Sequence, residues 1–383
     1  MMKKVYLMIY DAGAGHRSTA NALQKVIEQQ KLPWEVYLVE AFKEILGTST
    51  SQNFYNNYVL QKNWAKIINE PLLVPLFKLQ IRFSHSAWLA SLKTYWKQHK
   101  PDMVVSVQPY LNRVFYESLQ IVLPDIPFVT LITDHADCPP HFWIEKQEQF
   151  LICPTKKAVE QAKSFGYTQE RLFRTSGVII HPRFYEPILC DRRIERQHLG
   201  LDPDCMTGLV LFGGNGSRVM LEIAKCLESF QQKLQLIFIC GRNEELAKAL
   251  RESQVHQKRF VTTFTQNVPY YMHLADFFIG KPGPGSLSEA LVMKLPVIVE
   301  RNFSTLIQER YNADWVEQQQ VGLVISNFRN IDKAVKKFLE PENFARYRAN
   351  VAAVNNRAVF EISDILQNIL AKSYNTAVTK AMA

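Results

Sequence analysis

Two glycine-rich segments in the second half of the chain have the composition of turns that bind phosphate groups. The first reads G-G-N-G-S from Gly213 to Ser217, and the second reads G-K-P-G-P-G from Gly280 to Gly285. Glycines allow the backbone to come close to a ligand, and the N–H groups at the start of a helix favour an anion. Because each segment joins an apolar stretch to a helical pattern, we expect both to donate backbone hydrogen bonds to a diphosphate.

Ser286 and Glu289 follow the second segment with the spacing of a capping box. In that arrangement a serine side chain accepts a backbone N–H at the start of a helix, and the acidic side chain reaches back to the serine N–H. The sequence therefore predicts a helix that opens at Ser286 and a strand from Pro296 to Val299 after it. The alternative is an ordinary strand, turn and capped helix that binds nothing.

His16 follows a turn of small residues, Asp11 to Gly15, that ends the apolar stretch from Val5 to Tyr10. In parallel α/β sheets, ligands bind at the carboxyl ends of the strands, where this turn lies. A neutral imidazole can take a proton from an attacking alcohol, which is general-base chemistry near its ordinary pKa. His16 is thus a candidate base, and the alternative is a solvated histidine at the start of a helix.

Asp134 ends another apolar stretch, Phe128 to Ile132, and is followed by His135, Asp137 and His141. The four residues together do not follow the spacing of a metal-binding helix, and no cysteine pair lies beside them, so we expect no metal site. We expect Asp134 to bind the hydroxyl group of an acceptor or to orient the base. A capping or turn aspartate is the alternative.

Short apolar stretches alternate with amphipathic helical patterns along the whole chain, which is typical of doubly wound α/β domains. With 383 residues, the chain is long enough for two such domains. We place the first domain at residues 1–188 and the second at 204–354, joined by the polar, charged residues 187–203.

The net charge of +9 indicates an anionic partner, for which the candidates are nucleotide phosphates, anionic lipids or nucleic acid. No recognition-helix or aromatic-sheet motif supports nucleic acid. The six cysteines are scattered without a C-x-x-C pair, which favours reduced thiols in the cytoplasm. The sequence has neither a signal-peptide pattern nor an apolar run long enough to span a membrane, so we expect a cytoplasmic or peripheral protein.

Aromatic residues are concentrated between about residues 45 and 100. If Phe77 to Lys97 is one helix, an aromatic side lies beside a basic side, which is typical of helices at an anionic membrane surface. The alternative is a crossover helix whose aromatic side packs on the sheet. The preceding stretch, Asn53 to Phe77, is the better candidate for contact with a membrane or a lipid acceptor.

The string G-K-P-G-P-G-S-x-x-E-A-L, followed by L-P-V-I, resembles the donor-sugar segment of the glycosyltransferase family that includes the monogalactosyldiacylglycerol synthases and diacylglycerol glucosyltransferases. It is also similar to the transferase that adds N-acetylglucosamine to the peptidoglycan lipid. The resemblance extends to A-G-H at His16 and to K-P-D-M-V-V-S-V-Q-P, in which Gln108 stands where histidine is usual. It implies the GT-B fold, in which two doubly wound domains face across a cleft and a last helix, here 355–383, crosses back to the first domain.

The resemblance also implies roles for particular residues. His16 and Asp134 would be catalytic, and His141 and Trp143 would lie on the acceptor side. Glu289 would bind the ribose hydroxyls, Val268 the uracil through its backbone, and Gln308 with Glu309 the hydroxyls of the transferred sugar, although a glutamine is usual at the position of Glu309. The donor contacts implied in full are Gly15, Gly213, Gly214, Gly216, Ser217, Val268, Lys281, Gly283, Pro284, Gly285, Ser286, Glu289, Gln308, Glu309 and Asn312.

These observations predict an inverting transferase that moves galactose or glucose from a UDP-hexose to diacylglycerol at an anionic membrane surface. No D-x-D metal motif of a sugar-nucleotide site is evident, so we expect neither a metal nor another cofactor. The alternatives are transfer to another lipid-linked acceptor, epimerisation of a UDP-amino sugar, and a non-catalytic protein that binds a UDP-sugar or a lipid.

Overall fold

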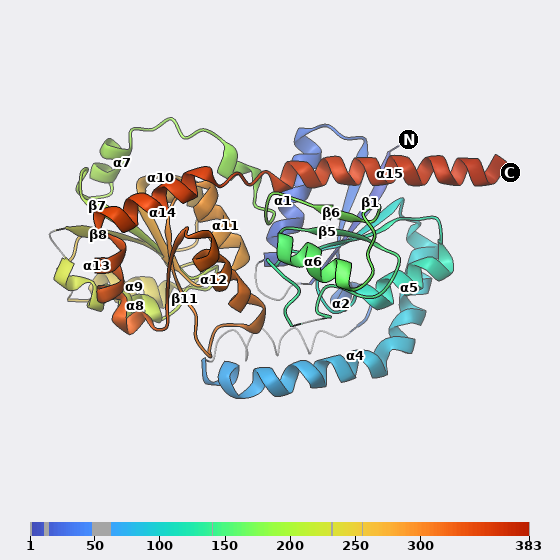
Figure 1. The fold of residues 1–383 in the computed structure, drawn as a ribbon, viewed down its shortest axis with the longest axis horizontal. Helices are drawn as coiled ribbons and strands as arrows, with labels where there is room; N and C mark the ends of the chain where they lie inside the picture. Colours follow the sequence, from blue (N-terminus) through green and yellow to red (C-terminus); the bar gives the residue numbers. More distant parts are fainter. Residues whose placement is uncertain are drawn as a thin grey trace. The chain divides into compact units, whose positions relative to one another are not determined.

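The structure, a computed structural model, describes residues 2–10, 15–47, 63–139, 141–230, 233–254 and 256–382, with the backbone alone for 63–78, 80 and 374–382. The chain folds into two compact units, Met1–Pro182 with Arg357–Ala383, and Arg183–Asn356 (Figure 1). Each unit is a parallel sheet of six strands with helices around it, so the predicted doubly wound α/β fold is confirmed. None of the helices, over the described part of the chain, is both long and apolar enough to cross a bilayer.

The sheet of the first unit has the strand order β2-β1-β3-β4-β5-β6. Its order reverses between β1 and β3, which is the point where parallel α/β sheets bind ligands. The inner strands are short apolar runs that are mostly buried, as expected for a parallel sheet, whereas the edge strands β2 and β6 are partly exposed. They are β1 (Lys3–Ile9), β2 (Trp34–Glu40), β3 (Met103–Ser106), β4 (Phe128–Leu131), β5 (Phe150–Cys153) and β6 (Leu172–Arg174), and the helices are α1 (Gly15–Gln29), α2 (Ala41–Glu44), α4 (Asn63–His99), α5 (Asn112–Val122), α6 (Lys156–Ser164) and α15 (Ala358–Met382).

The sheet of the second unit has the strand order β12-β11-β10-β7-β8-β9, with its reversal between β7 and β10. Its strands are β7 (Met206–Leu211), β8 (Leu234–Ile239), β9 (Arg259–Thr262), β10 (Phe277–Gly280), β11 (Val297–Glu300) and β12 (Gly322–Ile325). Its α-helices are α7 (Arg192–His198), α8 (Val219–Cys226), α9 (Glu244–Glu252), α10 (Val268–Leu274), α11 (Pro284–Val292), α12 (Ile307–Gln319), α13 (Ile331–Phe338) and α14 (Pro341–Ala353), with 3-10 turns η2 (Pro182–Tyr185), η3 (Glu228–Phe230) and η4 (Phe328–Asn330).

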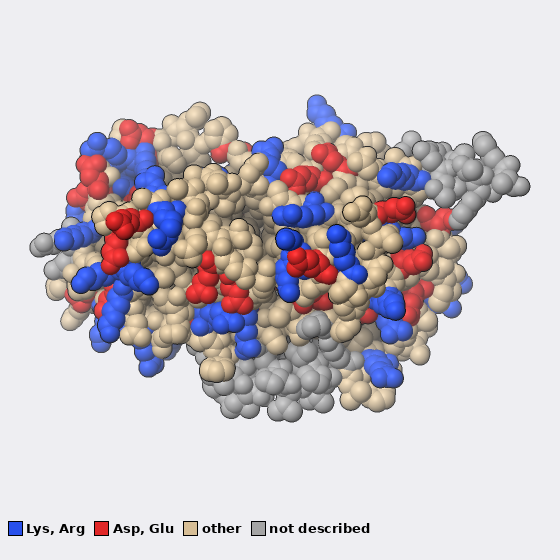
Figure 2. All heavy atoms as spheres, viewed as in Figure 1, with Lys and Arg blue, Asp and Glu red and all other residues tan. Residues whose placement is uncertain are grey.

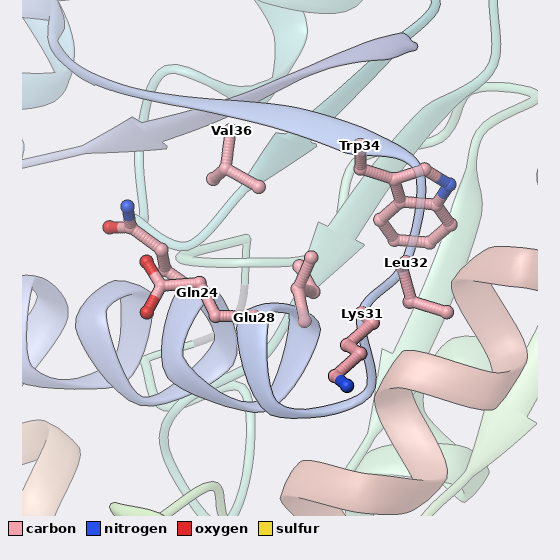
Figure 3. A pocket seen from close by; sticks show the side chains of 7 residues that line it. Gln24, Glu28, Lys31, Leu32, Trp34 and Val36 are labelled. Atoms are coloured by element: carbon pink, nitrogen blue, oxygen red, sulfur yellow. The ribbon is translucent and has the colours of Figure 1, made fainter.

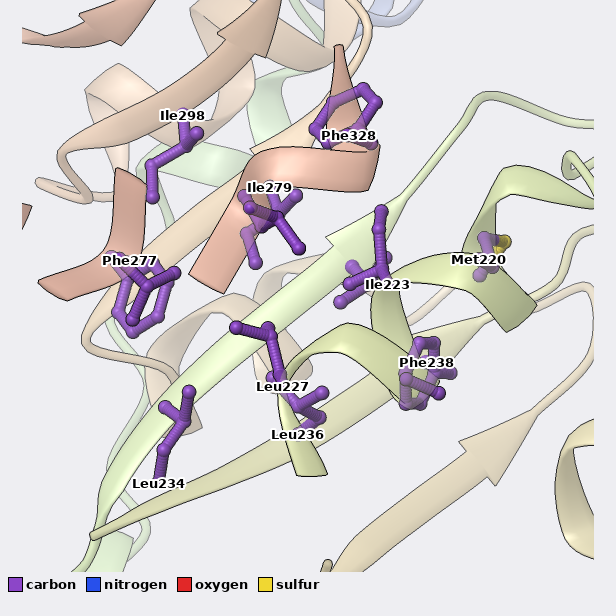
Figure 4. Close-up of a cluster of buried hydrophobic side chains, with 14 of the residues drawn as sticks. Met220, Ile223, Leu227, Leu234, Leu236, Phe238, Phe277, Ile279, Ile298 and Phe328 are labelled. Atoms are coloured by element: carbon purple, nitrogen blue, oxygen red, sulfur yellow. The ribbon is translucent and has the colours of Figure 1, made fainter. Parts of the chain in front are cut away.

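An aromatic and aliphatic core holds one face of the second sheet against its helices (Figure 4). The cluster contains Phe277 and Ile279 from β10, Phe238 from β8, Ile223 from α8 and Phe328 from η4. All five side chains are almost fully excluded from solvent. The strands that carry the glycine-rich turns are therefore anchored by close packing.

Helix α15 belongs to the first unit and is attached there by side-chain hydrogen bonds. The backbone N–H of Ser176 donates to Glu361 at 2.7 Å, and Ser363 donates to Gln30 near the end of α1 at 2.6 Å. Figure 1 shows α15 running past α1.

The predicted linker, residues 187–203, lies within the second unit. It contains α7, whose Arg196 is buried and donates to Asp276 at 2.8 Å and to the carbonyl oxygen of Leu274. Arg192 also donates to Asp276, at 2.7 Å. These bonds attach the segment to the residues just before the inner strand β10, which its polar composition did not reveal.

Helix α4 contains the predicted helix from Phe77 to Lys97. Between residues 81 and 99, Trp88, Leu92 and Trp96 are buried against α5 and the sheet, and Trp96 donates to Ser118 at 2.8 Å. The crossover alternative is thus confirmed for this part of the helix. Residues 53–62 of the proposed membrane segment lie outside the described residues, and the side chains up to Phe77 do as well.

Charged side chains of both signs are interspersed over the face of the molecule drawn in Figure 2. The excess of basic residues is not gathered into one stripe on that face. The net charge therefore does not by itself single out a binding surface there.

The contacts of Asp276 generate a stability prediction. Replacing Asp276 by alanine leaves the buried guanidinium of Arg196 without its ionic partner, so we expect a loss of about 3 kcal/mol in the free energy of unfolding. Asp204 provides the matched control, because its ion pair with Arg193 is exposed on both sides. Asp204→Ala should change the free energy by less than about 1 kcal/mol. Urea denaturation measures both, and equal losses in the two variants would contradict the assignment.

Candidate active site

The two glycine-rich turns start side by side at the reversal point of the second sheet. Leu211 at the end of β7 is the register partner of Gly280 at the end of β10. Gly213 and Gly216 have φ values of 73° and 63°, which favour glycine. The structure thus brings both predicted phosphate turns to one place.

Lys281 belongs to the second turn, and its side chain lies between the two turns. Its Cε would be 3.8 Å from a Cβ atom built on Gly213 and 3.2 Å from one built on Gly283. Its ammonium group contacts the carboxylate of Glu309, with a distance of 2.6 Å between Nζ and Oε1. The Glu309 side chain is 8 % exposed and that of Lys281 is 39 % exposed, so the positive end of the pair is the one open to a ligand.

Helix α11 begins at Pro284 and not at Ser286, so the predicted serine cap and capping box are wrong. Gly283 is the N-cap residue, and no side chain caps the helix. Proline at the first helical position has a φ that fits a helix and no N–H that needs a partner. The helix therefore starts two residues earlier than predicted. The N–H groups of Gly285 and Ser286 then lie in the first turn, where a helix offers donors to an anion.

Asn312 and Gln308 come from the first half of α12. Asn312 is fully buried, and its Nδ2 donates to the carbonyl oxygen of Pro282 at 2.7 Å, so it fixes the backbone of the second turn. Gln308 is half-buried in the first turn of the helix, next to Glu309. Two predicted donor residues therefore converge on the second turn, where Glu309 holds Lys281 and Asn312 holds Pro282.

Glu289 lies one turn further along α11. Desolvation raises the pKa of its carboxyl group to about 7, and the positive charge of Arg183 lowers that pKa in part. Arg183 also donates to the carbonyl oxygen of Gln266 at 2.7 Å, just before Val268 and the start of α10. Sequence reasoning missed Arg183, because it lies more than 80 positions from both partners and carries no motif.

Three predicted residues also meet in the first unit. The ring centroids of His16 and Trp143 are 5.9 Å apart. The indole N–H of Trp143 donates to Oδ2 of Asp134 at 2.9 Å. Trp143 is fully buried, so it joins His16, at the start of α1, to Asp134, which follows β4.

Asp137 organises the loop that carries Trp143. Its carboxylate accepts the backbone N–H groups of His141, Phe142 and Trp143 at 2.7 to 2.9 Å. Burial raises the pKa of Asp137, and these hydrogen bonds lower it in part. This role was missed from sequence, although an aspartate a few residues before backbone donors is typical of such turns.

His141 is exposed, and its ring packs edge-on against Phe165 with centroids 4.7 Å apart. Of the described residues, no three histidine, cysteine or acidic side chains lie close enough together to hold a metal ion. Residues Asp11 to Ala14, before His16, lie outside the described residues.

A pocket of about 290 Å³ lies elsewhere in the first unit (Figure 3). Trp34 at the start of β2 and the last turn of α1 form its walls. His16 is at the other end of α1, so this pocket is at the opposite edge of the sheet from the His16 cluster. Its lining residues are Gln24, Ile27, Glu28, Lys31, Leu32, Trp34 and Val36.

The pKa of Glu289 generates a pH prediction. The folded carboxyl group holds its proton up to about pH 7, against an ordinary value of 4.5, so the stability that it contributes is present at low pH and lost as the pH rises through 7. Glu289→Gln does not titrate and avoids this loss.

From pH 5 to pH 8, the melting temperature of Glu289→Gln relative to the wild type should therefore increase by about 3 °C or more. Thermal unfolding followed by circular dichroism measures the difference. The control is Glu252→Gln, at an exposed position of α9, whose difference from the wild type should stay constant. A constant difference for Glu289→Gln too would show that the carboxyl group is not desolvated.

Comparisons with known proteins match the two halves of the chain to two family models. Residues 16–180 match the family model "Monogalactosyldiacylglycerol (MGDG) synthase", and residues 209–369 match "Glycosyltransferase family 28 C-terminal domain". Between them the two models match most of the chain.

Two plant relatives illustrate the similarity in sequence. A probable monogalactosyldiacylglycerol synthase 2, chloroplastic, of Oryza sativa subsp. japonica is 26% identical, over 94% of this chain and 79% of the relative. Monogalactosyldiacylglycerol synthase 2, chloroplastic, of Arabidopsis thaliana is 26% identical, over 84% of this chain and 70% of the relative.

Solved structures show the same fold. The crystal structure of Acinetobacter baumannii MurG has a TM-score of 0.63 at 13% identity, covering 96% of this chain and 99% of that one. Anabaena HepE in complex with UDP has a TM-score of 0.55 at 14% identity, covering 97% of this chain and all of that one. The GT-B fold expected from the sequence is thereby confirmed.

Proposed function

Because this chain belongs to the glycosyltransferase family of the monogalactosyldiacylglycerol synthases, we propose that it transfers galactose or glucose from a UDP-hexose to the hydroxyl group of diacylglycerol. The observation that carries the proposal is the convergence of two glycine-rich turns and Lys281 at the reversal point of the second sheet. Backbone N–H groups, helix starts and a half-exposed ammonium group are what a diphosphate requires.

The remaining donor contacts follow from the positions of the residues around these turns. Glu289 would accept the two ribose hydroxyls, because a carboxylate has oxygen atoms for both. Val268, at the uncapped start of α10, would read the uracil through its backbone. Gln308 would contact the sugar, and Glu309 and Asn312 would act by holding Lys281 and Pro282.

The acceptor half belongs to the first unit, where His16 would be the general base. The acceptor hydroxyl attacks the anomeric carbon, and its proton passes to the imidazole. The bond between that carbon and the UDP oxygen breaks from the opposite face, which inverts the configuration, and UDP leaves with the electron pair. Trp143 and Asp134 would orient the base, and Lys281 with the helix starts would balance the diphosphate charge without a metal or other cofactor.

We further propose that the protein works on an anionic membrane surface facing the cytoplasm. The outer side of α4 supports this location, because Leu79 and Phe83 are exposed there beside the exposed Arg82. Apolar and basic side chains together are the chemistry by which a peripheral helix enters the headgroup region. All six cysteines are free, as expected in a reducing compartment.

The direct test is UDP release from UDP-galactose and UDP-glucose, with diacylglycerol in anionic vesicles, in neutral vesicles, or absent. We expect release that depends on diacylglycerol, is faster on anionic vesicles and uses one sugar preferentially. His16→Ala should lower kcat by about 10² to 10⁴ while UDP binding is unchanged. UDP binding without lipid-dependent release would overturn the proposed acceptor, and unchanged turnover of His16→Ala would overturn the assignment of the base.

Substitution of Gly285 can test the proposed diphosphate site without disturbing the fold. A Cβ atom at Gly285 would meet no atom within 4 Å, so Gly285→Ala should fold as well as the wild type. Its methyl group would stand at the start of α11, so we expect UDP affinity to fall by about tenfold or more, as measured by calorimetry. In contrast, Gly280→Ala places its methyl group 2.5 Å from the carbonyl oxygen of Leu211 and should destabilise the fold itself. Unchanged UDP affinity in Gly285→Ala would place the diphosphate elsewhere.

A further inference from the structure

Gln108 is fully buried, two residues after the end of β3. Neither the nitrogen nor the oxygen of its side-chain amide has a hydrogen-bond partner among the residues that the structure describes. Buried polar atoms in folded proteins are nearly always paired, because leaving them unpaired lowers stability. A completely unpaired amide therefore indicates a partner that the described part of the chain does not supply.

The other buried glutamines show that this chain normally satisfies such groups. Gln149 accepts from Thr130 at 2.9 Å and from Gln147 at 2.7 Å, and it donates to Tyr167 at 2.9 Å. The amides of Gln235 and Gln257 are likewise hydrogen-bonded. Gln108 is the exception among the four glutamines that are buried in the described residues.

The position of Gln108 is also particular. Strand β3 lies between β1, which leads to His16, and β4, which leads to Asp134. Met8 and Thr130 are the register partners of Ser106 on the two sides, so the three strand ends are level with one another. Gln108 thus lies in the row of strand ends that carries the proposed base and its carboxylate, at the point where the strand order reverses.

The segment after Gln108 is attached to the loop of Trp143. The N–H of Tyr110 donates to the carbonyl oxygen of Phe142 at 2.9 Å. The side-chain amide of Asn112 donates to the backbone carbonyl oxygen of Trp143 at 3.0 Å. The same scaffold therefore holds Gln108 and the indole that joins His16 to Asp134.

We infer that the amide of Gln108 binds an oxygen atom of the glycerol portion of the lipid acceptor, an inference that rests on the proposed function. The amide N–H groups can donate to an ester carbonyl or to the hydroxyl oxygen. The amide gives up no hydrogen bond to a described residue when the acceptor enters, so the new bond is gained in full. An amide does not titrate near neutral pH, so Gln108 positions the acceptor and leaves proton transfer to His16.

Gln108→Met tests the inference, because methionine has nearly the same shape and no hydrogen-bonding amide. Removing an unpaired amide should leave the melting temperature unchanged or higher, whereas the matched Gln149→Met, which breaks three bonds, should lower it by about 3 °C or more. In turnover assays, Gln108→Met should raise the KM for diacylglycerol by about tenfold or more, with the Kd for UDP unchanged. Gln149→Met should leave that KM unchanged.

A dialkylglycerol acceptor, which lacks ester carbonyls, identifies the bonded atom. If Gln108→Met raises KM for the diacyl lipid alone, the bond is to an ester; if it raises KM equally for both lipids, the bond is to the hydroxyl oxygen. An unchanged KM for both lipids, or a loss of stability as large as that of Gln149→Met, would overturn the inference. If the wild type transfers nothing to diacylglycerol, the proposed function fails, and the stability comparison still decides whether the amide of Gln108 is unpaired.

Discussion

The ion pair between Lys281 and Glu309 is the interaction on which the donor side depends. Glu309 is almost buried, so its negative charge is poorly screened and is best compensated by one nearby cation. That cation is held between two glycine turns whose strands are register partners. The pair thus couples α12 to both turns, and it presents a positive charge where the N–H groups of α11 also point. The proposed diphosphate would bind at this point and balance that charge.

In the first unit, a different carboxylate, that of Asp137, orders a loop. Asp137 accepts three backbone N–H groups and so defines the loop that carries Trp143. Trp143 is rigid and fully buried, and it has one polar atom, which it uses on Asp134 while its ring contacts His16. In both units, a buried acid beyond the carboxyl ends of parallel strands orders a loop, and the loop then positions the side chains that we propose as ligand contacts.

Much of this could be predicted from local sequence. Continuous apolar runs before the turns at Gly213 and Gly283 predict buried parallel strands, and the strand-turn-helix order predicts where a ligand binds. The start of α11 was mispredicted, because Ser286 and Glu289 fit a capping box and the effect of Pro284 at the first helical position is stronger. The role of Arg183 could not be predicted, since its partners are distant in sequence and leave no pattern, whereas the turn formed by Asp137 had a local signal that was missed.

The sequence by itself determined the fold class and the alternation of strands and helices over a length sufficient for two domains. It also determined the residue types that could bind a diphosphate or take a proton. These properties depend on periodicity and on residues close together in the chain. Only the tertiary structure decided that Glu309 and Asn312 support the turn, that Trp143 links His16 to Asp134, and that Gln108 alone among the buried glutamines of the described chain has an unpaired amide. Burial and hydrogen-bond partnership depend on which strand ends meet, and residues far apart in sequence set that.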